Sequence, residues 1–104
     1  MNVPLDVSIA DLRRRAEQHA QAIDKIKAAR ADNERMNSEA STLGPLYHEV
    51  RASIGEVTAR RDEALAAEER RHEEMRDALL QSAAEYERVD AENRAKLTFN
   101  PADR

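Results

Sequence analysis

The sequence contains no cysteine and no tryptophan, and only two glycines and three prolines among its 104 residues. Without cysteine the chain can form neither a disulfide framework nor a thiolate metal site. All-β and α/β proteins need many turns, and so few glycines and prolines are atypical of them. Aromatic residues make up only 3% of the chain, so it is unable to build a large core by itself. The composition therefore excludes most enzymes and predicts a non-enzymatic protein.

Long apolar runs and an excess of basic charge are also missing. No run approaches the roughly 20 residues that span a bilayer, and Asp6 and Asp11 interrupt the region where a Sec signal peptide would be apolar. The net charge is −4, with 17 basic and 21 acidic residues interspersed, so no phosphate-binding basic face is expected. We predict no integral membrane span, no Sec signal and no nucleic-acid partner.

The first half of the chain carries a stripe of residues spaced alternately three and four apart. This spacing is typical of a helix face that packs on another helix. Ser8, followed three residues later by Asp11, resembles a capping box and marks a helix start. We predict a first helix over about residues 8–41. Its stripe consists of Ile9, Leu12, Ala16, His19, Ile23, Ile26, Arg30, Asn33, Asn37 and Ala40.

A turn is predicted at residues 42–45, where stop and start signals adjoin. Gly44 can end the first helix in the left-handed conformation, and Pro45 fits the first turn of the next helix. The second helix should run from about residue 45 to about 97. Pro101 prevents its continuation because proline lacks an amide donor, which leaves a short tail over residues 98–104.

The second helix carries a weaker stripe with a polar middle. Gly55 lies within this helix at a cost of roughly 1 kcal/mol relative to alanine, which a close approach of the helices would explain. The predicted stripe consists of Leu46, Val50, Ile54, Val57, Arg61, Ala64, Glu68, His72, Met75, Leu79, Ala83, Tyr86 and Leu97.

These elements predict an all-α fold, a single antiparallel helical hairpin over residues 1–104. Because the second helix is longer, it should overhang the first over about residues 79–97, with an apolar face that has no partner within the chain. Two helices share only one seam, so a hairpin completes its core by packing against another hairpin. We predict a four-helix bundle formed by a homodimer or a heterodimer. Its partner interface should include Leu79, Ala83, Val89 and Leu97.

Candidate catalytic and metal-binding residues are few. None of His19, His48 and His72 is part of the His-Glu-x-x-His spacing of a helical zinc site. The pairs Asp62-Glu63 and Glu68-Glu69 lie in a charge-rich helix and are expected to form a solvated face. We predict no catalytic site, no metal and no cofactor.

One further pattern, Tyr86-Glu87-Arg88-Val89-Asp90, lies near the end of the second helix. Tyrosine and aspartate four residues apart point to the same side of a helix, which sets an aromatic ring beside a carboxylate. The spacing alone favours the interpretation that Tyr86 is a seam residue and that Asp90 pairs with Arg94.

Several stretches, in order, are similar to those of a known family. They are Val7-Ser8-Ile9-Ala10-Asp11-Leu12, Ala16-Glu17-Gln18-His19-Ala20, Gly44-Pro45 and Ser82-Ala83-Ala84-Glu85-Tyr86-Glu87-Arg88-Val89-Asp90. In this order they resemble the secreted helical-hairpin proteins of type VII (ESX) systems in mycobacteria and related actinobacteria, within them the EspC-like group. The resemblance covers nearly the whole chain.

This resemblance implies a protein that folds in the cytoplasm and is then exported, by a Sec-independent route, out of the cell or to its surface. The type VII machinery, including its ATPase, would be a partner, and another helical hairpin would accompany the chain. The family's Y-x-x-x-[DE] export signal maps onto Tyr86 and Asp90. The alternative function is that of a cytoplasmic structural or adaptor coiled coil that pairs with one helical partner.

Overall fold

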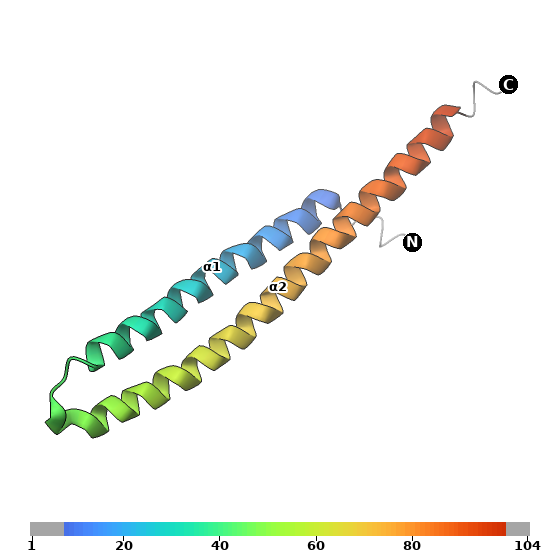
Figure 1. Ribbon diagram of the computed structural model, residues 1–104. Coiled ribbons are helices and arrows are strands. Elements are labelled where there is room, and N and C mark those ends of the chain that lie inside the picture. Colours follow the sequence, from blue (N-terminus) through green and yellow to red (C-terminus); the bar gives the residue numbers. More distant parts are fainter. Residues whose placement is uncertain (1–7, 100–104) are drawn as a thin grey trace. The chain divides into compact units, whose positions relative to one another are not determined.

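The computed structural model describes residues 8–99, and every regular element in that range is a helix. Helix α1 spans Ile9–Ala40, a short 3₁₀ helix, η2, spans Pro45–Tyr47, and helix α2 spans His48–Phe99 (Figure 1). Two compact units share these helices. Of the described residues, unit 1 contains 8–19 and 75–99, and unit 2 contains 20–74. The predicted all-α hairpin is confirmed, whereas the predicted stop at Pro101 lies outside the described residues.

Helix α1 begins where the capping signal predicts. The Ser8 hydroxyl oxygen accepts a hydrogen bond from the Asp11 amide at 2.9 Å, and the Ser8 carbonyl accepts one from the Leu12 amide at 3.1 Å. A side chain that satisfies an otherwise unpaired amide of the first turn stabilises a helix start. Ser8 is therefore the N-cap of α1.

Hydroxyl groups close the other end of α1. The Ser41 hydroxyl donates to the Ser38 carbonyl at 2.6 Å, and the Thr42 hydroxyl donates to the Glu39 carbonyl at 2.6 Å. The Thr42 amide also donates to the Glu39 carbonyl, at 3.1 Å. These bonds satisfy carbonyls that the end of a helix leaves unpaired.

Gly44 does not adopt the predicted left-handed conformation. Its φ of −72° and ψ of 176° are extended backbone, and the Gly44 carbonyl accepts a hydrogen bond from the Tyr47 amide at 2.9 Å. A residue that precedes proline is restricted to extended conformations, so Pro45 accounts for the geometry. Pro45 opens the 3₁₀ helix, and α2 begins at His48 rather than at residue 45.

The buried residues of α1 all belong to its predicted stripe. They are Leu12 and Ala16 in unit 1, and Ile23, Asn33 and Ala40 in unit 2. The spacing rule therefore identified the correct face of α1.

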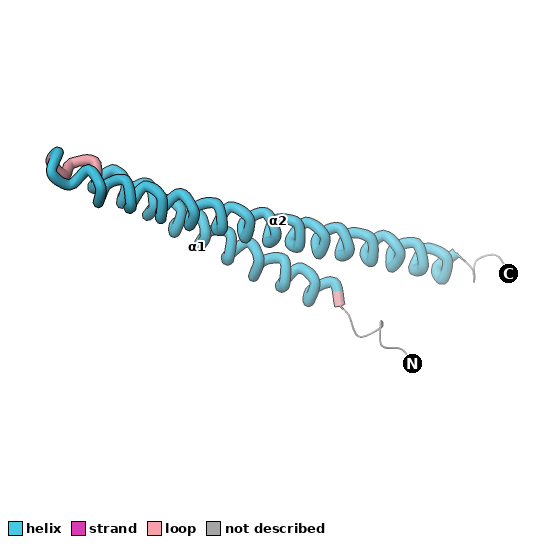
Figure 2. Tube along the Cα trace, turned by 90° about the horizontal axis from the view of Figure 1, so that it is seen from below, coloured by secondary structure: helices cyan, strands magenta, loops and turns pink. Residues whose placement is uncertain are grey.

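The predicted stripe of α2 is wrong within unit 2, where it is one residue out of register. Leu46 is 94% exposed and Val57 is 58% exposed, whereas Thr58 is only 1% exposed. The side that faces α1 includes Thr58, Asp62 and Glu69, which are polar, so a search for apolar periodicity finds the neighbouring side instead. In this unit the two helices run antiparallel on either side of the turn (Figures 1 and 2).

In unit 1 the start of α1 packs on the later part of α2. Ala83 is 1% exposed, and the Arg13 guanidinium forms an ion pair with the Glu87 carboxylate at 2.7 Å. The start of α1 therefore reaches as far along α2 as Glu87. The prediction that the overhang starts at Leu79 is wrong. Helix α2 continues past the start of α1 (Figure 1), and this overhang begins beyond Ala83.

Candidate functional site

The Tyr86–Asp90 pair lies on α2, one helical turn apart, just where the packing of α1 ends. Tyr86 is 41% exposed, and Asp90 is also exposed. A regular helix fixes the direction of both side chains, so the ring and the carboxylate lie on neighbouring parts of one surface. The two groups are available to a binding partner without local unfolding.

The charged residues next to Tyr86 and Asp90 form ion pairs with one another along α2. Arg88 donates to the Glu85 carboxylate at 2.7 Å and to the Glu92 carboxylate at 2.7 Å. The hydrogen bond with Glu85 is the largest of the interactions that raise the pKa of Arg88 above its ordinary value. The guanidinium between Tyr86 and Asp90 in sequence is therefore already engaged by carboxylates on its own helix.

The ion pair between Arg13 and Glu87 connects the same segment to α1. Both side chains are about half exposed, so the pair adds little to stability. It does place the first turns of α1 beside a residue that lies within the Tyr86–Asp90 segment. Sequence reasoning missed this contact because Arg13 and Glu87 are far apart in the sequence, where local patterns carry no information on register.

A groove of about 640 Å³ lies beside the seam in unit 1. We call it the unit 1 groove. Helix α1 contributes one wall and α2 the other. Its lining residues are Arg14, Arg15, Gln18, His19, Met75, Ala78, Leu79 and Ser82.

The residues predicted as a partner interface have different surroundings. Ala83 is buried within the chain, and Leu79 lines the unit 1 groove. Val89 and Leu97 are exposed on α2. Ala83 therefore serves the internal seam, and the other three remain accessible to a partner in whole or in part.

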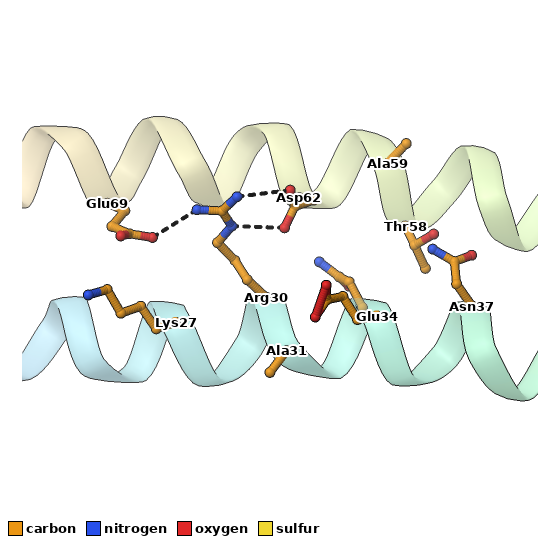
Figure 3. Close-up of a pocket in the computed structure, with 10 residues that line it drawn as sticks. Lys27, Arg30, Ala31, Glu34, Asn37, Thr58, Ala59, Asp62 and Glu69 are labelled. Atoms are coloured by element: carbon orange, nitrogen blue, oxygen red, sulfur yellow. Dashed lines mark hydrogen bonds and ion pairs between the residues drawn. The ribbon is translucent and has the colours of Figure 1, made fainter.

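A cluster of charged residues occupies the middle of unit 2. Arg30 of α1 donates to both carboxylate oxygens of Asp62, at 2.9 and 3.2 Å, and to Glu69 at 3.0 Å. Figure 3 shows the Arg30 side chain extending from α1 to these two carboxylates of α2. The hydrogen bond from Arg30 lowers the pKa of Asp62, and the two carboxylates raise the pKa of Arg30. Asp62 and Glu69 are thus bound across the helices, contrary to the predicted solvated face.

Asn33 lies next to this cluster and is only 3% exposed. Neither its amide nitrogen nor its amide oxygen has a hydrogen-bond partner of standard geometry, although the amide is close enough to Asp62 to help lower that pKa. A pocket of about 480 Å³ opens beside it. We call Arg30 and Asn33 of α1, together with Thr58, Asp62 and Glu69 of α2, the polar seam.

Residues 8–99 contain no group of three or more histidine, cysteine, aspartate or glutamate side chains placed to hold a metal ion. In the same range, no helix is long and apolar enough to cross a membrane.

The fold and the exposed Tyr86–Asp90 pair define a class of protein, the helical hairpins that carry a tyrosine and a carboxylate near the end of the second helix. The sequence model of one such family, described as "Excreted virulence factor EspC, type VII ESX diderm", matches residues 1–98. The chain therefore belongs to the EspC family of type VII ESX systems, and the predicted resemblance is confirmed. This is a family of secreted virulence factors and is not known as a family of enzymes.

Comparison with curated proteins and with solved structures gives no significant match.

Proposed function

We propose that a type VII ESX system exports this chain and that Tyr86 and Asp90 form its export signal. The observation that carries the proposal is the exposure of both residues on one turn of α2, in a chain of the EspC family. A regular helix presents the ring and the carboxylate together, so a receptor binds them without ordering a flexible segment. The receptor is the secretion machinery, including its ATPase.

The route follows from this kind of recognition. The two groups keep their relative positions only while α2 is helical, so the chain folds in the cytoplasm before export. Export then depends on a folded signal rather than on a cleaved Sec signal peptide. The exported chain acts through binding and carries out no catalysis.

The chain also pairs with another helical hairpin, either a second copy or a different protein. Val89 and Leu97 support this part of the proposal because both are apolar and exposed on α2. A helical bundle buries such residues against facing helices.

The test compares the culture filtrate of the native host for wild type and for Asp90→Asn. This substitution keeps the shape of the side chain and removes its charge, so we expect a folded protein that stays inside the cell. Asp77→Asn is the matched control, because Asp77 is an exposed aspartate of the same helix outside the signal. A strain with an inactive type VII ATPase should retain all three proteins.

Export of Asp90→Asn at the wild-type level would contradict a charge-dependent signal. Retention of the wild type, while a known substrate is exported, would instead favour the cytoplasmic adaptor coiled coil. Tyr86→Ala separates signalling from packing. An export signal predicts a helical protein that is retained, whereas a purely packing role predicts lower stability or weaker association, which circular dichroism and light scattering measure.

A further inference from the structure

A second line of residues, apolar except for one serine, runs along α2 beside the seam of unit 1. Its residues are spaced alternately four and three apart, which is the spacing of a helix face that packs on another helix. They are Met75, Leu79, Ser82, Tyr86 and Val89. Met75 is 52% exposed and Val89 is 38% exposed, so α1 leaves much of this line uncovered. Ala83, in contrast, belongs to the neighbouring side of α2, which α1 covers.

The first part of this line forms one wall of the unit 1 groove, together with Ala78. Met75, Ala78, Leu79 and Ser82 line it from α2. These four residues are spaced as neighbours on one helix face, over two helical turns. Such a surface accepts the apolar side of a further helix.

The opposite wall is basic. Arg14 and Arg15 of α1 line it, together with Gln18 and His19, and no acidic residue lines the groove. Arg14 also forms an ion pair with Asp11 at 2.8 Å within α1. Both arginines are exposed, so they remain accessible to a further carboxylate at the edge of the groove.

We propose that the unit 1 groove is a docking site for an acidic amphipathic helix of a partner protein. The apolar residues of that helix pack on Met75 and Leu79, and its carboxylates pair with Arg14 and Arg15. Apolar burial supplies most of the affinity, and the charges select the partner and its orientation. This inference rests on the partner role proposed above and is independent of the export signal.

A binding assay with a defined probe tests the proposal. The probe is a synthetic helix of about three heptads, with leucine at positions a and d and glutamate at positions e and g. A matched probe carries lysine in place of glutamate. Fluorescence anisotropy with the full chain should show binding of the glutamate probe and, at equal concentration, binding of the lysine probe at least about tenfold weaker.

Charge reversal in the groove provides the discriminating variant. Arg14→Glu combined with Arg15→Glu should lower the affinity for the glutamate probe by about tenfold or more and raise the affinity for the lysine probe. Arg70→Glu combined with Arg71→Glu is the matched control, because this exposed pair lies in unit 2. Equal binding of both probes by the wild type, or no change in the groove variant, would overturn the proposal.

A single label locates the binding site. The chain has no cysteine, so Ser82→Cys introduces one attachment point for an environment-sensitive dye in the groove. Ser38→Cys provides the control position on an exposed part of α1 in unit 2. The glutamate probe should shift the emission of the dye at residue 82 and leave the dye at residue 38 unchanged. A shift at residue 38 alone would place binding elsewhere and overturn the proposal.

Self-association is the remaining outcome. Sedimentation measures whether copies of the chain associate, and the emission of the dye at residue 82 reports whether that association buries it. If a second copy buries the dye and excludes the probe, the groove belongs to that copy and the proposal is wrong. The export assay gives an independent reading. Loss of probe binding with normal export of the Arg14→Glu, Arg15→Glu variant leaves the export signal standing, and loss of export through Asp90→Asn says nothing against the groove.

Discussion

At the scale of single residues, the buried side chain of Asn33 has unfavourable surroundings. Both of its amide atoms are buried without a hydrogen bond of standard geometry. Burying an unpaired amide costs roughly 1–3 kcal/mol. A polar residue at a seam position can nevertheless fix the register of two helices, which an apolar residue does less well.

We expect Asn33→Leu to raise the free energy of unfolding by roughly 1–3 kcal/mol, because the substitution removes an unpaired buried amide and adds apolar burial. The pocket of about 480 Å³ beside it leaves room for the larger side chain. Denaturation with urea, followed by circular dichroism, measures the change. Asn37→Leu is the control, since Asn37 is exposed, and should change stability much less. Destabilisation by Asn33→Leu would contradict this account.

Asp62 predicts how stability depends on pH. Its pKa in the folded chain lies below the ordinary value of 3.8, because Arg30 donates hydrogen bonds to its ionised form. A carboxyl group with a lowered pKa stabilises the fold fully above its unfolded-state pKa. That stabilisation is lost as the pH falls through the folded-state pKa.

The melting temperature of the wild type should therefore fall as the pH is lowered below 3.8. Asp62→Asn should lower the melting temperature at neutral pH. Because this variant has no carboxyl group at residue 62, its melting temperature should fall less than that of the wild type when the pH is lowered. Thermal melts at a series of pH values measure both effects, and Asp24→Asn serves as the control. Identical pH profiles for the wild type and Asp62→Asn would argue against the role of the ion pair.

At the scale of elements, α2 contains a glycine that its surroundings do not require. A Cβ atom on Gly55 would lie 3.9 Å from the Asn37 side-chain oxygen, which is an ordinary contact. We expect Gly55→Ala to stabilise the chain by up to about 1 kcal/mol, because alanine has the higher helix propensity. Ala59→Gly, at an exposed position of the same helix, should lower the free energy of unfolding by a similar amount. A loss of stability in Gly55→Ala, measured by urea denaturation, would reveal a close approach of the helices.

The elements also show what the sequence could predict. The cap at Ser8 and the seam of α1 were predictable because they depend on local spacing and on apolar periodicity. The contact side of α2 in unit 2 was not, because an apolar line with Val50 and Val57 adjoins the polar side that faces α1. A search for apolar periodicity selects the line with Val50 and Val57, whereas Arg30 binds carboxylates on the polar side.

The candidate site was predictable only in part. Tyr86 and Asp90 follow from their spacing and from the family resemblance. The pairing of Arg13 with Glu87 and the unit 1 groove depend on how α1 and α2 align in unit 1. That alignment is set across a large separation in sequence, where local patterns carry no information on register.

At the scale of the whole molecule, both units expose apolar residues of α2. In unit 2 these are Val50 and Val57, with Leu46 of η2 exposed beside them, and in unit 1 they are Val89 and Leu97. A thin helical core with such surfaces is typical of a chain that completes its packing with other helices. Association is therefore expected to involve more than one part of α2.

We expect native mass spectrometry to detect a dimer or a complex with a helical partner above the 11.8 kDa of one chain. Val50→Asp combined with Val57→Asp should weaken the association that uses unit 2, because both side chains are exposed and lose their apolar character. The helix content, measured by circular dichroism, should not change. Ala59→Asp is the control on another side of α2, and a stable folded monomer at all working concentrations would contradict the expectation.

The polar seam also determines how the chain responds to temperature. Unfolding raises the heat capacity mainly by exposing apolar surface, and newly exposed polar surface lowers it. Among residues 8–99 the buried apolar residues are few and mostly alanine, namely Leu12, Ala16, Ile23, Ala40 and Ala83. The heat-capacity change of unfolding should therefore fall below the usual value of about 12–15 cal/mol/K per residue. The free energy of unfolding then follows a shallow curve, so the fold of an isolated chain varies little in stability between cold and warm conditions.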